Sequence, residues 1–286
     1  MAASTAALRG ITKQYKDFTL GPVDMTVPAG SIVGLIGENG AGKTTLLKIL
    51  CGVNRADDGT VDLLGGSPAD AATRAKIGVV FEDAFFYGSF TAAQVARSLA
   101  GMYGAQWNAD SFSAYLRRFG LDAGKKLKEY SRGMRLKLSL AAALAHGPEL
   151  LVLDEATAGL DPVVRGELLD LFLEFIQDER HSIVMSSHIT ADLEQIADSI
   201  AYLHNGQLLF QENKDDLLQE YGVLHCGEDV LPSLPAGLVV FTRRGAYGCE
   251  SLVRERRTVQ ELLPEVVCDA ARLDDIMRFY SWRDAQ

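Results

Sequence analysis

The sequence contains 286 residues, 48% of them hydrophobic, and carries a formal net charge of −10 at pH 7. A chain of this length and composition can build one large domain with a buried core and a smaller addition. The acidic balance argues against a broad nucleic-acid-binding face, so no nucleic-acid partner is expected.

Three further features of the composition indicate a cytoplasmic protein. The four cysteines are scattered without the spacing of a zinc site or a small disulfide framework, which is typical of reduced thiols. The first seven residues lack the charged and apolar segments of a secretory signal. The best candidate for a membrane span, residues 136–153, is interrupted by charged residues and a proline, whereas a spanning helix needs roughly 20 apolar residues. Any membrane process would therefore need a second chain to supply the spans.

The first predicted elements are two or three strands within residues 4–36, with turn signals at Gly21-Pro22 and at residues 28–30. Residues 31–36 are short and apolar, as a buried strand is, and residues 46–50 predict a helix. The loop between them fits the pattern Gly, four residues, Gly-Lys-Ser/Thr. Its residues, which we predict to bind a nucleotide, are Gly37, Glu38, Asn39, Gly40, Ala41, Gly42, Lys43, Thr44 and Thr45.

This loop has the chemistry of a phosphate site. Glycines let successive backbone N–H groups point into one concavity, and the helix N-terminus adds partial positive charge. Lys43 can reach the β- and γ-phosphates of a nucleoside triphosphate, and the Thr44 hydroxyl is placed to ligate Mg²⁺. A glycine-rich turn with a solvated lysine is the alternative, and the strand and helix on either side argue against it. We therefore predict binding of ATP and Mg²⁺.

The pattern after residue 60 alternates between strands and helices. Strands are predicted at residues 60–64, 77–81, 150–153, 182–185, 199–203 and 207–210, and helices at residues 163–177 and 190–197. Three amphipathic segments, residues 91–102, 109–119 and 131–145, predict a helical insert of about 60 residues. Such alternation implies an α/β fold with a mostly parallel sheet that is covered on both faces.

Two acidic residues follow the apolar strand at residues 150–153. Ligands bind at the carboxyl ends of strands in such sheets, so Asp154 and Glu155 are expected beside the phosphate loop. Asp154 would hold Mg²⁺ directly or through water, and Glu155 would polarise the attacking water as the catalytic base. Two acids at the end of a strand are ordinary by themselves, and the phosphate loop favours the functional interpretation.

Five pieces of the sequence occur in the order of one family. They are the phosphate loop, Ser131-Arg132-Gly133-Met134, Leu153-Asp154-Glu155, Ala158-Gly159-Leu160-Asp161-Pro162 and Ser186-Ser187-His188. Over roughly residues 5–220 the chain resembles the ATP-binding subunit of a bacterial ABC transporter, of the exporter type whose permease is a separate chain.

The resemblance implies a P-loop NTPase core of the ABC ATPase type, with an antiparallel β subdomain and a helical subdomain. It also implies a head-to-tail dimer, homodimeric or heterodimeric, that hydrolyses ATP for a transmembrane permease subunit on the inner face of the cell membrane. Ser131 and Gly133 would contact the γ-phosphate held by the opposite chain, and Asp161 would lie at the dimer seam. His188 would contact the γ-phosphate as a catalytic residue, and Tyr15 would stack on adenine.

The sequence departs from the family pattern at two places. Arg132 and Met134 replace a glycine and a glutamine of the usual Leu-Ser-Gly-Gly-Gln signature, although the serine and the following glycine remain. The strand at 77–81 leads into Glu82 where the family has a glutamine. A carboxylate can still ligate Mg²⁺ but cannot donate a hydrogen bond as an amide does. We expect Glu82 to be a metal ligand together with Thr44 and Asp154.

The domain organisation is predicted from a change in the sequence pattern after residue 221, where glycine and proline residues that mark loops become frequent. We expect an ATP-binding domain at residues 1–222, with its helical subdomain at about residues 86–147. Residues 223–286 would form a small α+β accessory region, with a strand at 238–242 and an amphipathic helix at 273–280 that packs against its copy in the dimer. The aromatic segment 83–91 is either core packing or a groove for a helix of the membrane partner.

Two other functions remain open from the sequence. A soluble ABC-type ATPase in repair or translation is the main alternative. Repair members carry long coiled coils between the loop and the signature, and translation members join two ATPase units, whereas this chain has one unit and a short insert. A P-loop kinase is the other alternative, but it would not explain the segment Tyr130 to Met134.

Overall fold

The computed structural model describes residues 4–81, 86–245 and 248–283, apart from the side chain of Arg283. Its chain divides into two compact units. The first comprises residues 1–189 and 201–211, and the second comprises residues 190–200 and 212–286. Each unit has its own sheet and core, so each is described by itself.

A six-stranded sheet with the order β5-β6-β7-β3-β8-β9 carries the functional residues of the first unit. The pairs β5/β6, β6/β7 and β7/β3 are parallel. All residues of β3, β6 and β7 are buried, which explains why the central residues of these strands are apolar. The strands are β3 (Ile32–Ile36), β5 (Ile77–Val80), β6 (Leu150–Asp154), β7 (Ser182–Ser186), β8 (Ser199–His204) and β9 (Gln207–Asn213).

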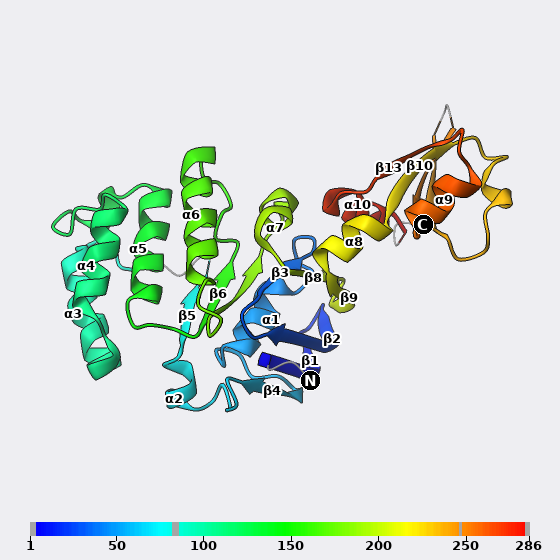
Figure 1. Cartoon of the computed structure of the whole chain (residues 1–286). Helices are drawn as coiled ribbons and strands as arrows, with labels where there is room; N and C mark the ends of the chain where they lie inside the picture. The colour runs from blue at the N-terminus through cyan, green and yellow to red at the C-terminus, as the bar shows by residue number, and fades with distance from the viewer. Residues whose placement is uncertain (1–3, 82–85, 246–247, 284–286) are drawn as a thin grey trace. The chain divides into compact units, whose positions relative to one another are not determined.

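A three-stranded antiparallel sheet with the order β2-β1-β4 forms the second layer of this unit (Figure 1). Helix α1 (Lys43–Leu50) contributes Leu46, Leu47 and Leu50 to a core cluster shared with both sheets. The phosphate loop, whose last three residues form the start of α1, is thereby anchored to the core between the two sheets. The strands of the antiparallel sheet are β1 (Ser4–Gln14), β2 (Thr19–Pro28) and β4 (Asp58–Leu63).

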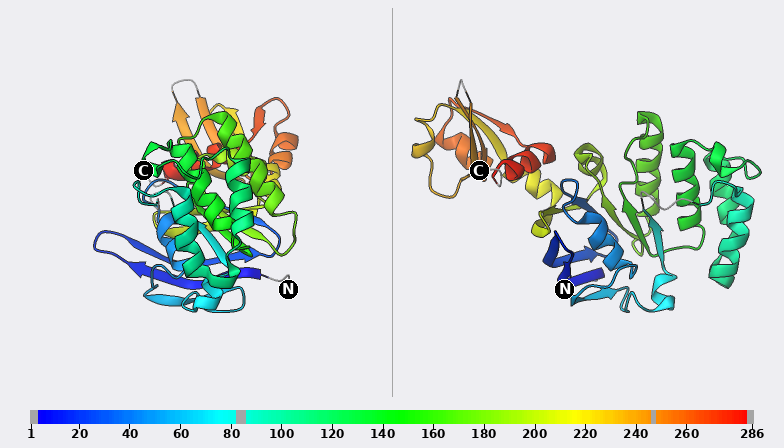
Figure 2. Two further views of the ribbon diagram at one scale, coloured as in Figure 1. Left: turned by 90° about the vertical axis from the view of Figure 1, so that its left-hand side faces the viewer. Right: turned by 180° about the vertical axis from the view of Figure 1, so that it is seen from behind.

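The helical part of the first unit has a second core of its own. Phe112, Leu127, Tyr130 and Leu138 are among its buried members. Figures 1 and 2 show its helices α3, α4 and α5 grouped together. The capping box formed by Thr91 and Gln94 begins α3. Besides α1, the helices of this unit are α2 (Ala71–Arg74), α3 (Ala92–Tyr103), α4 (Ala109–Arg118), α5 (Arg132–Leu144) and α6 (Pro162–Phe175).

The second unit is built on a four-stranded antiparallel sheet with the order β11-β12-β10-β13. One face packs on a cluster that includes Leu224, Val253 and Val259, and Phe241 contacts Phe279 of the last helix. The strands are β10 (Gly222–Cys226), β11 (Val239–Gly245), β12 (Gly248–Val253) and β13 (Val267–Ala270). The helices are α7 (Thr190–Ile196), α8 (Lys214–Glu220), α9 (Arg256–Leu262) and α10 (Leu273–Arg283).

The predicted α/β class is confirmed, with a mostly parallel sheet, an antiparallel β subdomain and a helical subdomain. Across the described ranges, none of the helices combines the length and apolar character that crossing a bilayer requires.

Candidate functional site

The loop between β3 and α1 has a backbone that only glycine adopts without strain at two positions. Gly40 has φ +85° and Gly42 has φ +105°, both in the left-handed region. A Cβ on Gly42 would lie 2.9 Å from Phe18 Cζ and 3.0 Å from Leu20 Cδ1. Any larger residue at 42 would therefore displace these side chains, which explains the glycine at the N-cap of α1.

Lys43 places its ammonium group inside this loop. The residue is 6% exposed, and Nζ donates to the carbonyl oxygens of Gly37 at 2.7 Å and Glu38 at 3.2 Å. The carboxylate Oε1 of Glu155 lies 3.5 Å from the same nitrogen. The three protons of the ammonium thus face three oxygen atoms. A phosphate oxygen that enters the loop would replace at least one of them.

Thr44 and Asp154 meet across α1 and β6. The Thr44 hydroxyl donates to Oδ2 of Asp154 at 2.8 Å, and the Ser186 hydroxyl donates to Oδ1 at 2.7 Å. Asp154 is 2% exposed, so its buried charge is stabilised by two hydroxyl donors. Hydroxyl and carboxylate oxygens are the hard ligands that Mg²⁺ prefers, and Thr44 itself is exposed. The residues present therefore fit a magnesium ion.

Glu155 and His188 form a second pair at the same edge of the sheet. His188 Nδ1 lies 2.6 Å from Oε2 of Glu155, and the backbone N–H of His188 donates to that oxygen at 3.3 Å. The Glu155 side chain is 11% exposed, whereas that of His188 is 52% exposed. Glu155 has φ +51°, a left-handed conformation that is uncommon for residues other than glycine. The carboxylate is thus held by a histidine on one side and by Lys43 on the other.

Tyr15 lies at the rim of the cleft that contains the phosphate loop. The residue is 42% exposed, and its ring centroid is 6.4 Å from that of Phe18. An exposed aromatic face at this position can stack on a planar base. The cleft has a volume of about 380 Å³ and is lined by Tyr15, Phe18, Glu38, Asn39, Gly40, Gly42, Lys43, Thr44, Thr45 and Glu155.

The signature residues line a different hollow. Ser131 is the N-cap of α5 and accepts a hydrogen bond from the N–H of Met134 at 3.2 Å. Asp161 is the N-cap of α6 and accepts from the N–H groups of Val163 and Val164. This hollow has a volume of about 300 Å³ and is lined by Phe119, Ser131, Arg132, Gly133, Met134, Lys137, Gly159, Leu160, Asp161 and Val164. It shares no lining residue with the cleft at the phosphate loop.

The structure therefore brings most of the predicted residues into two groups. Lys43, Thr44, Asp154, Glu155 and His188 are connected by direct contacts. The second group consists of the signature residues and Asp161, which line the other hollow. In the described part of the chain, no residue lines both this hollow and the cleft at the phosphate loop. Glu82, the third predicted metal ligand, lies outside the described residues.

Two residues of the site were not predicted from the sequence. Ser186 contacts Asp154 and the backbone of Glu155, although in the sequence it is only part of the motif that ends in His188. A hydroxyl at the end of a buried strand, next to the acidic strand end, was the available signal. Phe18 lines the cleft and limits residue 42, but as an aromatic residue next to a strand it carried no signal of its own.

The thiol of Cys51, the C-cap residue of α1, is buried in the core behind the phosphate loop. Its reactivity therefore tests whether solvent reaches this core. Burial, and then the nearby charge of Asp154, raise the pKa of Cys51 to about 12. At pH 8 only about one thiol in 10⁴ would be ionised. We expect iodoacetamide to leave Cys51 unmodified in the native protein at pH 8 and to modify it in urea, as measured by mass spectrometry of peptides. Equal labelling in both states would contradict this burial.

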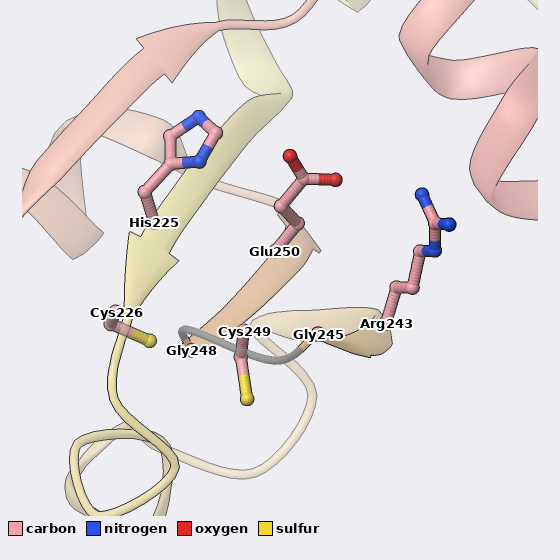
Figure 3. Close-up of a pocket in the computed structure, with 7 residues that line it drawn as sticks. All are labelled: His225, Cys226, Arg243, Gly245, Gly248, Cys249 and Glu250. Carbon is pink, nitrogen blue, oxygen red and sulfur yellow. The ribbon is translucent and has the colours of Figure 1, made fainter.

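The C-terminal unit contains a hollow that is larger than the cleft at the phosphate loop, so volume alone does not identify the site. It has a volume of about 490 Å³ and is lined by His225, Cys226, Arg243, Gly245, Gly248, Cys249 and Glu250, all from strands β10, β11 and β12. Figure 3 shows the His225 and Glu250 side chains on one side of these strands and the two thiols on the other. The phosphate cleft differs because a glycine loop and the start of a helix line it.

Comparisons with known proteins identify the family to which this chain is similar. The family profile described as ABC transporter matches residues 20–158. An uncharacterized ABC transporter ATP-binding protein of Synechocystis is 38% identical over 206 residues, which cover 70% of this chain and 58% of the relative. The bacitracin transport ATP-binding protein BcrA of Enterococcus faecalis is 36% identical over 212 residues, 72% of this chain and 68% of the relative. The aligned part of this chain thus spans between about half and two thirds of these two relatives.

A solved structure of the ATP binding subunit of an ABC transporter has the same fold. It superposes with a TM-score of 0.67 at 28% sequence identity, and the match covers 75% of this chain and 92% of the other.

Proposed function

The chain belongs to the family of ABC transporter ATP-binding proteins, and we propose that it hydrolyses ATP to drive a separate membrane permease. The observation that carries the proposal is the connected set of Lys43, Thr44, Asp154, Glu155 and His188 at the phosphate loop. This set combines a cation that can bind phosphate, oxygen atoms that can ligate a metal ion, and a carboxylate that can accept a proton from the attacking water. Hydrolysis of a phosphoanhydride needs these three elements.

Each residue of the set has a distinct part in the reaction. Lys43 and the N–H groups of the loop bind phosphate oxygens, and Tyr15 provides a face for adenine. Thr44 and Asp154 would hold Mg²⁺, which when bound neutralises charge on the phosphates. Glu155 accepts a proton from the attacking water. His188 orients the Glu155 carboxylate and offers a polar group toward the γ-phosphate.

We infer that two chains assemble head to tail to complete each site. Ser131 and Gly133 lie at the N-terminus of α5, where backbone N–H groups and the helix dipole favour an anion. Because their hollow is separate from the cleft of the same chain, the γ-phosphate that they contact would be held by a partner. Asp161 lines the same hollow, which supports its predicted position at the dimer seam.

Mixing two inactive variants tests this assembly. Lys43→Ala disables the phosphate loop, and Ser131→Arg blocks the signature. In a mixed dimer, one site carries both changes and the other carries neither. We expect each variant alone to be inactive, and an equal mixture to recover roughly a quarter of the wild-type ATPase rate, since half of the dimers would be mixed with one intact site each. No recovery, although mixed dimers are detected by native mass spectrometry, would contradict the head-to-tail arrangement.

The family supports a proposal for the partner and for the place of action. We propose a transmembrane permease encoded separately, a location on the cytoplasmic face of the membrane, and transport outward from the cell. The name of the bacitracin transport relative supports a transport role over soluble ABC ATPases of repair or translation. Reconstitution of the chain with its permease in vesicles would test the coupling, because the permease should raise the ATPase rate.

We retain the predicted domain organisation as a proposal. Residues 1–222 would form the ATP-binding domain, with its helical subdomain at about 86–147, and residues 223–286 would form an accessory region that contributes to dimerisation. The separate cluster around Leu224, Val253 and Val259 supports an accessory region with its own core.

A further inference from the structure

We propose that Ser186 is a positioning residue that fixes both acidic groups of the site, Asp154 and Glu155. The inference rests on the ATPase function proposed above and deepens it. Ser186 is the last residue of β7, is 0% exposed and pairs directly with Asp154 of β6 in the parallel sheet. Register therefore places its hydroxyl on the same side of the sheet as the Asp154 carboxylate.

The first contact of Ser186 orients the metal-binding group. Its hydroxyl donates to Oδ1 of Asp154 at 2.7 Å, while Oδ2 accepts from Thr44 at 2.8 Å. Both carboxylate oxygens are therefore held, and rotation of the carboxylate would break one of the two bonds. Without the Ser186 hydroxyl, Oδ1 of Asp154 would be buried and would lose this hydrogen bond. The carboxylate could then rotate, and Oδ2 would no longer be held beside Thr44. Hydroxyl donors behind a metal-binding carboxylate commonly tune metal affinity in this way.

The second contact holds the backbone from which the base projects. The N–H of Glu155 donates to Ser186 Oγ at 3.0 Å and to the carbonyl oxygen of Ser186 at 3.1 Å. Glu155 has φ +51°, a conformation that persists only when its surroundings hold it. From this position its carboxylate reaches both Lys43 and His188. One hydroxyl thus acts as donor to the metal-binding acid and as acceptor for the backbone of the base.

A purely structural role for a buried serine is the competing explanation, and the same strand offers a matched control. Ser182, at the other end of β7, is also 0% exposed and hydrogen-bonded, to Thr5 Oγ1 at 2.7 Å and to the N–H of Gly30 at 3.1 Å. Ser182→Ala also removes a buried serine hydroxyl from β7, but at the end of the strand that lies away from Asp154 and Glu155. It therefore measures the effect of lost buried hydrogen bonding alone.

We expect Ser186→Ala to lower kcat by about 10- to 100-fold and to weaken divalent metal binding by a similar factor, as other supporting residues of metal sites do. Metal binding is measured with Mn²⁺ by electron paramagnetic resonance in the presence of a non-hydrolysable ATP analogue. Affinity for a fluorescent nucleotide in EDTA should stay unchanged, because Lys43 and the loop do not depend on this hydroxyl. Ser182→Ala should match the wild type in kcat and in Mn²⁺ affinity, whatever its melting temperature.

Ser186→Cys keeps a polar atom at this position but replaces the hydroxyl with a larger group that is a poorer donor, so it serves if the alanine variant does not fold. It should show the same loss of kcat and Mn²⁺ affinity. Wild-type kcat and Mn²⁺ affinity in a folded Ser186 variant, or equal losses in Ser182→Ala, would overturn the positioning role. The proposed function fails separately, if the wild-type protein itself neither binds nor hydrolyses ATP.

Discussion

Glu155→Gln is expected to lower kcat for ATP hydrolysis by about 10²- to 10⁴-fold, the range typical of a lost general base. The amide has nearly the same shape as the carboxylate but cannot accept the proton of the attacking water. ATP binding should persist, because Lys43 and the loop remain. Release of phosphate measures kcat, and titration with a fluorescent nucleotide measures affinity. In the presence of ATP this variant should also form a stable dimer, which size-exclusion chromatography would detect.

Glu149→Gln is the matched control for this substitution. Glu149 immediately precedes β6, whereas Glu155 immediately follows it, and its carboxylate pairs with Lys76 at 3.2 Å on the surface. An exposed pair of this kind contributes little, so kcat should equal that of the wild type. A Glu155→Gln protein with wild-type kcat would show that another group takes the proton and would remove Glu155 from the role of base.

Lys43→Met is expected to weaken ATP binding by about 100-fold or more, because each charge-assisted hydrogen bond to phosphate contributes about 1.5–3 kcal/mol. The methionine retains the apolar stem but has no ammonium group. The Glu155 carboxylate would also lose the cation 3.5 Å away, and its repulsion of phosphate would then be unopposed. Isothermal titration with ATP in EDTA isolates this effect from metal binding.

Lys48→Met provides the comparison on the same helix. Lys48 lies in the last turn of α1, and its Nζ is 5.6 Å from the centre of the Phe81 ring, outside the lining of the nucleotide cleft. The substitution removes one positive charge from α1. ATP affinity should stay within about twofold, since a partly exposed charge that does not line the cleft is screened by water. Equal losses in both variants would mean that net charge, rather than a contact of Lys43, determines binding.

The sequence predicted the parts of the fold whose pattern is local. The strands predicted at 150–153 and 182–185 are fully buried parallel strands, and the helix predicted at 131–145 is α5. By contrast, strands β10, β12 and β13 and helices α8 and α9 were not predicted. Strand β13 is short and largely exposed. Strands β10 and β12 bury Leu224 and Val253, but both are short stretches in which glycine, cysteine and polar residues interrupt the apolar pattern. In such segments pairing with other strands decides the structure, and the sequence gives weak local signals.

The candidate site was predicted unevenly for a similar reason. Lys43, Thr44 and the strand-end acids belong to contiguous motifs, so their neighbourhood could be read along the chain. Ser186 acts through β-sheet register, because the pairing of β6 with β7 brings it beside a residue 32 positions away in sequence. Phe18 acts through a steric contact with Gly42 that requires the folded β1–β2 hairpin. Such contacts between distant segments leave no pattern in a single sequence.

The placement of Lys43 between two backbone carbonyls and Glu155 also affects how the protein responds to salt. Its ammonium group is already removed from bulk water and already has a counterion within the protein. When a nucleotide binds, a phosphate oxygen therefore replaces a carbonyl or carboxylate oxygen beside a cation that is already dehydrated. Mobile ions of the solvent have little access to such a centre, so this part of the affinity should persist at ionic strengths that screen attraction at the protein surface.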